Sequence, residues 1–155
     1  MSVSRYTLCE NKKKHKVYLR KIEDLDISSD FNIDNAGKVI EIVSKVFDFK
    51  HLAEEEVHAL FLNAHGQLLG VSQISKGGLT QSYVTLRSLF IRAMLLNASG
   101  YVLIHNHPSM DCHPSKEDIN LTHKLKEMGE IMGVFLLDHI IVGDGYKSFV
   151  RESLL

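Results

Sequence analysis

Two histidines that flank a single residue at the end of an apolar run constrain this chain most. His105, Asn106, His107 and Pro108 directly follow residues 101–104, the β-prone segment Tyr-Val-Leu-Ile. Because side chains alternate faces along a strand, His105 and His107 are predicted to project to one side and Asn106 to the other. Pro108 has no amide hydrogen with which to continue a strand ladder. The sequence therefore predicts two imidazoles side by side at a strand end, followed by a turn.

A helix start follows this turn. Ser115 is a typical N-cap residue, and Asp118 lies three residues later, where free amide groups and the helix dipole favour an acidic side chain. Such a pair is most often a simple helix cap. Together with His105 and His107, however, Asp118 completes three ligands of the kinds that zinc prefers. We therefore predict that these three residues bind a metal ion, and we expect Zn²⁺.

The number of ligands indicates a catalytic site. Structural zinc sites use four protein ligands, whereas catalytic sites use three and leave one position to water, whose pKa then falls to about 7. A proton acceptor must come from elsewhere in the chain. The acidic cluster Glu54, Glu55 and Glu56 precedes a predicted strand at 57–63 and could lie beside the site. The alternative for this cluster is a solvated acidic strand entry.

These motifs together resemble the JAMM motif of the JAB/MPN metallopeptidase-like domains, and more closely the bacterial RadC family. The resemblance spans about residues 50–152 and rests on a Glu-led strand into Leu-Phe-Leu-Asn, on His-Asn-His-Pro-Ser, on Pro-Ser-x-x-Asp-Ile and on Leu-Asp-His-Ile-Ile-Val-Gly. It implies a zinc-dependent metallopeptidase- or isopeptidase-like hydrolase that acts on a peptide or protein substrate. It also implies an α/β fold with a mixed β-sheet flanked by helices in three layers.

The resemblance also assigns roles to single residues. It implies that His105, His107 and Asp118 bind zinc, that Glu55 is the general base, and that Ser115 helps to stabilise the developing oxyanion. A slip of one residue would reverse the face that each glutamate presents, so Glu54 and Glu56 remain alternatives for the base.

The loop between the histidines and the helix departs from the family. It reads Met-Asp-Cys-His-Pro at 110–114, without the glycine and the additional proline of the usual Gly-Asp-Pro-Thr-Pro segment. Cys112 and His113 are potential further zinc ligands, although a free thiol in a loop is the simpler interpretation of Cys112. Asp138 and His139 form either a pair that orients a ligand or a structural hydrogen bond.

Apolar periodicity predicts the elements around the site. We expect helices at 36–49, at 85–97 with Thr85 as the cap, and from Ser115 to about residue 128. Predicted strands cover 5–9, 17–22, 57–63, 68–75, 101–104, 134–142 and 146–150. We expect His58 to be a surface strand residue and His65 a turn residue. Residues 1–33 are interpreted as an N-terminal strand extension packed on a domain at 34–155, so that the chain is effectively a single domain.

Composition restricts partners and compartment. Two cysteines, a net charge of −1 and residues 1–16 without an apolar core predict a cytoplasmic protein without a secretory signal or membrane span. The basic run at 12–16 lacks interleaved aromatic residues, so we interpret it as a solvated hairpin turn and do not expect direct nucleic-acid binding. Two functional alternatives stay open. One is a non-catalytic metal-binding module that acts in DNA repair or mobile-element biology through protein partners, and the other is hydrolysis of a bond other than a peptide bond.

Overall fold

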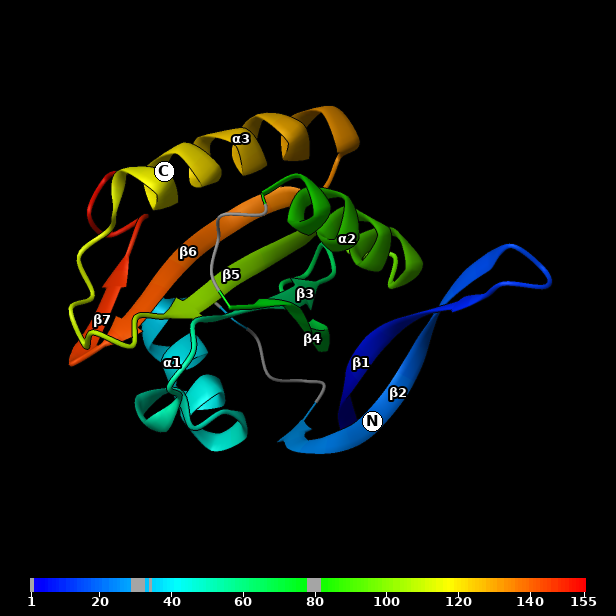
Figure 1. Cartoon of the computed structure of the whole chain (residues 1–155), viewed down its shortest axis with the longest axis horizontal. Coiled ribbons are helices and arrows are strands. Elements are labelled where there is room, and N and C mark those ends of the chain that lie inside the picture. Colours follow the sequence, from blue (N-terminus) through cyan, green and yellow to red (C-terminus); the bar gives the residue numbers. More distant parts are fainter. Residues whose placement is uncertain (1, 29–32, 34, 78–81) are drawn as a thin grey trace.

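The computed structural model describes residues 2–28, 33, 35–77 and 82–155, which form one sheet covered by helices (Figure 1). The strands are β1 (Ser2–Asn11), β2 (Lys16–Ser28), β3 (Glu56–Leu62), β4 (Leu68–Lys76), β5 (Gly100–Asn106), β6 (Phe135–Gly143) and β7 (Gly145–Ser148). The helices are α1 (Ala36–Val46), α2 (Ser82–Leu95) and α3 (Lys116–Met132), with a short 3₁₀ helix, η1 (Phe49–His51).

The sheet is mixed, in the order β2-β1-β4-β3-β5-β6-β7. The pairs β1–β4 and β5–β6 are parallel, and the other neighbouring pairs are antiparallel. All seven residues of β5 are buried, as expected for a central strand with both faces covered. The strand that carries His105 is therefore in the interior of the sheet.

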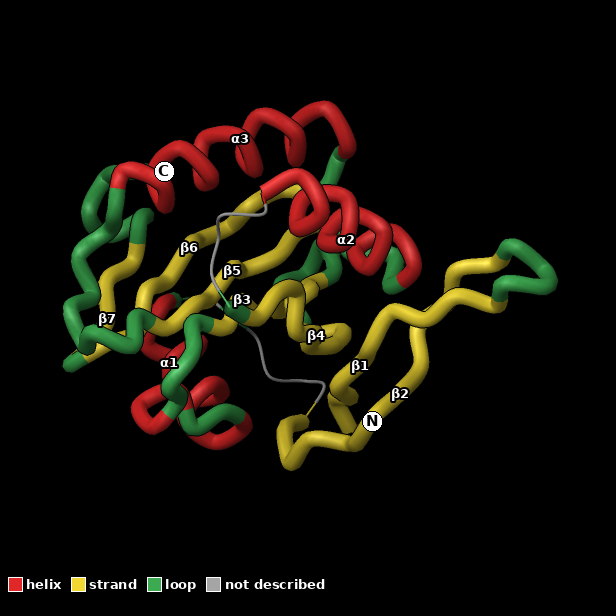
Figure 2. The backbone as a smooth tube through the Cα atoms, viewed as in Figure 1, coloured by secondary structure: helices red, strands yellow, loops and turns green. Residues whose placement is uncertain are grey.

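The helices form the two outer layers. α1 packs on one face of the sheet, and α2 and α3 pack on the other (Figure 1; Figure 2). Two hydrophobic clusters correspond to these faces, one containing Val39 and Ile42 of α1 and the other containing Leu89 of α2 and Leu125 of α3. This three-layer α/β arrangement confirms the predicted fold class. Within the described residues, no helix is long and apolar enough to cross a membrane.

α1 is shorter than the predicted helix at 36–49. It ends at Val46, because Phe47 adopts an extended backbone. Phe47 and Phe49 instead turn toward the sheet and pack against the ring of His58, at centroid distances of 4.1 and 5.3 Å. His58 is fully buried by these contacts, so its prediction as a surface residue is wrong. His65, in contrast, lies exposed in the turn after β3, as predicted.

The other two helices also differ from their predicted bounds. α2 begins three residues before Thr85, so Thr85 is not its cap. α3 passes through Gly129 and ends only at Met132, and its C-cap residue Gly133 has φ 67° and closes the helix in the left-handed conformation. Gly129 permits a close approach, because a Cβ there would lie 2.5 Å from the carbonyl oxygen of Val134. The chain can therefore return from α3 directly into β6.

The N-terminal hairpin of β1 and β2 projects beyond the rest of the sheet (Figure 2). Both strands are longer than predicted, and β1 joins the sheet through parallel pairing of residues 4–6 with 70–72 of β4. Residues 12–15 of the basic run form the exposed turn between the two strands, as expected, and Lys16 begins β2.

Candidate metal centre

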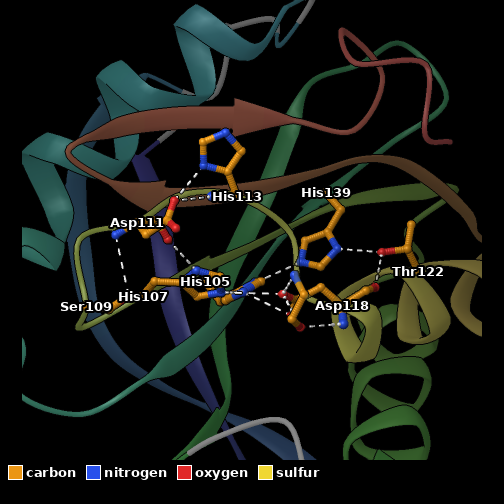
Figure 3. A network of polar contacts seen from close by, with 9 residues as sticks. His105, His107, Ser109, Asp111, His113, Asp118, Thr122 and His139 are labelled. Atoms are coloured by element: carbon orange, nitrogen blue, oxygen red, sulfur yellow. Dashed lines mark hydrogen bonds and ion pairs between the residues drawn. The ribbon is translucent and has the colours of Figure 1, made fainter.

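The two histidines lie at the carboxyl end of β5. His105 is inside the strand, and His107 follows its last residue and donates its backbone N–H to Val142 of β6 at 2.9 Å. Asp118 lies in the first turn of α3. The predicted alternation holds, because His105 and His107 face Asp118 whereas Asn106 contacts the segment before β3. A strand end and a helix N-terminus thus bring the three residues together (Figure 3).

The three side chains converge on one point. The Nε2 atoms of His105 and His107 are 3.0 Å apart, and they lie 3.3 and 3.4 Å from Oδ1 and Oδ2 of Asp118, respectively. Zinc bonds of about 2.0–2.1 Å at tetrahedral angles separate neighbouring ligand atoms by roughly 3.3–3.4 Å. The donor set and its spacing therefore fit a zinc ion. Within the described part of the chain, these residues are the group of His, Cys, Asp and Glu side chains close enough to hold a metal.

Burial leaves one side of this group accessible. The side chains of His105 and Asp118 are 0% and 2% exposed, whereas that of His107 is 17% exposed. A cation between the three would thus be enclosed by the sheet and α3 on one side and approachable beside His107. This asymmetry is what a site with three protein ligands and a free position requires.

Asp118 is held in its ionised form. Burial raises the pKa of its carboxyl group, but the adjacent ring of His105 and the hydrogen bonds from Ser115 outweigh burial and hold this pKa well below its usual range. The backbone N–H and the hydroxyl of Ser115 both donate to Oδ2, at 2.7 and 2.6 Å. Ser115 Oγ also accepts the N–H of Asp118, so the predicted capping box is confirmed.

A backbone carbonyl fixes the ring of His107. Its Nδ1 lies 2.6 Å from the carbonyl oxygen of Asp111. Because a carbonyl can only accept, Nδ1 carries the proton, and in the neutral ring the lone pair is on Nε2, which faces Asp118. Lone pairs on a nitrogen and a carboxylate oxygen 3.4 Å apart repel each other unless positive charge lies between them. This tautomer thus turns the Nε2 lone pair of His107 toward Asp118, as a metal ligand at this point requires.

The three glutamates at the start of β3, Glu54, Glu55 and Glu56, have different environments. Glu54 pairs with Lys76 at 3.0 Å, and Glu56 contacts buried His58 at 3.0 Å. Glu55 differs, because its Oε1 is buried and has no hydrogen-bond partner among the described residues. Among the three glutamates, Glu55 therefore has a carboxylate oxygen, Oε1, that is buried but not used in a hydrogen bond with the described residues.

Strand register places Glu55 on the face of the sheet that carries His105. Val57 pairs with His105 across the antiparallel β3–β5 ladder, so both side chains lie on the same face. Gly77 donates its N–H to the carbonyl of Glu55 at 2.8 Å, which continues the β3–β4 pairing past Glu56. Alternation along this extended segment gives Glu55 the face of Val57, and gives Glu56 the opposite face with His58.

Asn106 joins the two segments. Its side chain, 1% exposed at the residue level, accepts the backbone N–H of Glu56 at 2.8 Å and donates to the carbonyl of Glu54 at 3.1 Å. These bonds hold the two peptide groups that flank Glu55 to the residue between the two histidines. The distance between Glu55 and the histidine pair is thereby fixed through the backbone.

A sequence profile of the RadC-like JAB domain matches residues 33–154. The chain belongs to the RadC-like JAB domain family. The UPF0758 proteins of Pelobacter propionicus and Geobacter sulfurreducens are 44% and 42% identical to it over 117 and 110 residues, covering 72% and 70% of this chain. A UPF0758 protein of Clostridium botulinum is 46% identical over 105 residues and 67% of the chain. The chain spans about half the length of these relatives, 51%, 48% and 46%, respectively.

In this RadC-like JAB domain, the divergent loop is held against the end of β6. Met110 has φ 66°, and its carbonyl accepts the N–H of Asp144 at 2.7 Å. A Cβ on Gly143 would lie 2.3 Å from the same carbonyl oxygen, so only glycine allows this approach. Close packing against Gly143 and the bond from Asp144 thus hold the backbone of this loop in place.

Neither Cys112 nor His113 lies in the group formed by His105, His107 and Asp118. His113 is exposed and pairs with Asp111 at 2.6 Å, and Cys112 is a partly buried free thiol. The converging group contains His105, His107 and Asp118 alone among the residues described. The loop therefore supports the RadC-like site through its backbone rather than by adding ligands.

Sequence reasoning missed the environment of His139 in the RadC-like motif. Asp138 does not contact its ring but accepts the backbone N–H groups of His139 and Val150 and the Ser148 hydroxyl. The ring of His139 instead contacts His105 at 2.8 Å and Thr122 at 2.7 Å. Neither contact has a local sequence signal, because the first depends on β5–β6 register and the second on how α3 lies over β6.

Proposed function

We propose that this RadC-like JAB domain is a zinc-dependent metallopeptidase- or isopeptidase-like hydrolase, in which water attacks the carbonyl carbon of an amide. The observation that carries the proposal is the convergence of two imidazole nitrogens and one ionised carboxylate at a strand end, with one side accessible. The chain spans about half the length of its relatives. We therefore include in this proposal the activity of a longer protein, its peptide or protein substrate and its partners.

The proposed roles follow from the contacts. His105, His107 and Asp118 would hold the zinc ion, which supplies a Lewis acid that polarises the carbonyl and makes the attacking water more acidic. Glu55 accepts a proton from the water as the carbon–oxygen bond forms, and delivers it to the amine nitrogen as the carbon–nitrogen bond breaks. The uncommitted oxygen of Glu55 and its register on the face of His105 support this role.

Ser115 is proposed to donate a hydrogen bond to the developing oxyanion. Its hydroxyl donates to Asp118 in the structure, so this role requires the hydroxyl to rotate toward the substrate. The residue is exposed at the start of α3, where a substrate carbonyl can reach it. No covalent serine intermediate is proposed, because the two nearby histidines serve as ligands.

Zinc content and amide cleavage of matched variants test the proposal. Wild-type protein with one equivalent of zinc is incubated with peptide and isopeptide-linked lysine libraries, and new amines are identified by mass spectrometry. We expect Glu55→Gln to keep its zinc but to lose about 10²–10⁴-fold in turnover. Glu56→Gln, which alters the neighbouring carboxylate on the opposite face, should keep both zinc and turnover.

Two results would contradict the proposal. Full turnover in Glu55→Gln would remove Glu55 as the base. Zinc bound stoichiometrically by a wild-type protein that cleaves no library member would favour the non-catalytic metal-binding module.

A further inference from the structure

A buried chain of polar contacts connects two of the three candidate ligands on the side away from the metal position (Figure 3). Nδ1 of His105 lies 2.8 Å from Nε2 of His139, and Nδ1 of His139 lies 2.7 Å from Oγ1 of Thr122. Oγ1 of Thr122 in turn lies 2.7 Å from the backbone carbonyl oxygen of Asp118. His105, His139 and Thr122 are each 0% exposed, so water does not compete for these contacts.

The direction of each hydrogen bond follows from the Asp118 carbonyl. A carbonyl oxygen can only accept, so Thr122 uses its single hydroxyl proton to donate to it. Oγ1 must then accept from Nδ1–H of His139. In a neutral His139 ring this leaves Nε2 as an acceptor, and Nδ1 of His105 must donate to it.

His139 is suited to stay neutral. Its ring is fully buried, and its two nitrogens contact an imidazole and a hydroxyl, neither of which is a carboxylate that would favour the charged ring. The ring is also held in place, because it stacks on Phe149 at a centroid distance of 4.6 Å and an interplanar angle of 21°.

We propose that His139 and Thr122 are positioning residues that hold His105 in the tautomer protonated on Nδ1, so that its Nε2 lone pair points at the metal position. The inference rests on the metal site of the proposed function. It gives the two histidine ligands separate orienting partners: the Asp111 carbonyl for His107, and the Thr122–His139 relay for His105. The relay begins at the backbone carbonyl of Asp118, so the residue that supplies the carboxylate ligand also determines the tautomer of His105.

Loss of the threonine hydroxyl breaks the relay without removing a ligand. In Thr122→Val, which has nearly the same shape, Nδ1–H of His139 has no acceptor. The alternative His139 tautomer, protonated on Nε2, would then donate to Nδ1 of His105 and move the His105 proton to the metal-facing Nε2. Thr122→Ser keeps the hydroxyl and is the matched control.

The first measurement is zinc affinity of the full chain by competition with a chromophoric chelator. We expect Thr122→Val to bind zinc about 10–100-fold more weakly than wild type, the range typical for loss of a residue that orients a ligand. Thr122→Ser should stay within about threefold of wild type on the same scale. A purely structural packing role for Thr122 predicts the reverse order, because valine preserves its volume better than serine does. Equal affinity of wild type and Thr122→Val would overturn the proposal.

The second measurement needs no variant. Two-bond ¹⁵N–¹H couplings in the metal-free wild-type protein report which imidazole nitrogen carries the proton. For the neutral rings we expect Nδ1–H in both His105 and His139, and an Nε2–H tautomer of neutral His105 would overturn the proposal. Absence of zinc binding by the wild-type chain would overturn this inference and the proposed function together. Tight binding that is insensitive to Thr122→Val would overturn the inference alone.

Discussion

Replacement of Asn106 by leucine tests whether the residue between the histidines holds the glutamate segment in place. The two side chains have the same number and branching of heavy atoms, so the substitution removes polar groups without opening a cavity. It leaves the Glu56 N–H and the Glu54 carbonyl without their bonds of 2.8 and 3.1 Å. A buried group left unsatisfied costs about 1–3 kcal/mol, and Glu54 lies on the exposed side of the segment, where water can replace part of the loss. We expect a total loss of about 2–4 kcal/mol in the free energy of unfolding.

Urea unfolding of the metal-free protein measures this loss. The same change at Asn120, an exposed residue of α3, is the control and should alter the free energy of unfolding by less than about 0.5 kcal/mol. With zinc added, Asn106→Leu should still bind the metal, because the hydrogen bonds of the Asn106 side chain go to the backbone of Glu54 and Glu56 and not to either histidine ring. Its turnover should fall about 100-fold, because Glu55 is no longer held at a fixed distance. A variant as stable and as active as wild type would refute the reasoning that Asn106 positions Glu55.

Two other predictions concern the loop and acid stability. Gly143→Ala places a Cβ 2.3 Å from the Met110 carbonyl oxygen, so we expect the free energy of unfolding in urea to fall by about 1–3 kcal/mol. We also expect weaker zinc binding, because the loop whose Asp111 carbonyl holds the His107 ring would shift. Gly129→Ala meets a similar backbone clash far from the metal group and should lose stability without losing zinc affinity, and equal affinities in the two variants would contradict the prediction. Burial lowers the pKa of the His58 ring below its usual value of 6.5, although Glu56 opposes this shift. The unfolded chain therefore binds a proton at His58 more readily than the folded protein does. The stabilising contribution of neutral His58 should be complete above about pH 6.5 and be lost as the pH falls through its lower pKa in the folded protein. We therefore expect His58→Gln to flatten the pH dependence of the free energy of unfolding between about pH 7 and 5. Parallel pH curves for the variant and the wild-type protein would contradict this.

The metal group was predictable because local rules determine it. Strand alternation placed His105 and His107 on one face, and the capping box fixed Asp118 at the start of α3. Both rules act over a few residues, so the sequence contains all that they need.

Contacts between distant segments were not predictable in the same way. The burial of His58 depends on two phenylalanines that follow α1, and periodicity continued that helix past its actual end at Val46. The ring of His139 reaches His105 because Leu103 pairs with His139 across parallel strands, a register that local sequence does not encode. The face that each glutamate presents likewise depends on the observed pairing of Val57 with His105.

The central claim is that His105, His107 and Asp118 hold one cation and leave a position for water. X-ray absorption at the zinc edge of the reconstituted protein tests it most directly. We predict one zinc per chain with nitrogen and oxygen neighbours at about 2.0–2.1 Å, two of them imidazoles, and no sulfur neighbour at about 2.3 Å. His107→Ala and Asp118→Ala should each release most of the metal. A spectrum with a sulfur ligand from Cys112, or four protein ligands that enclose the ion, would contradict the account.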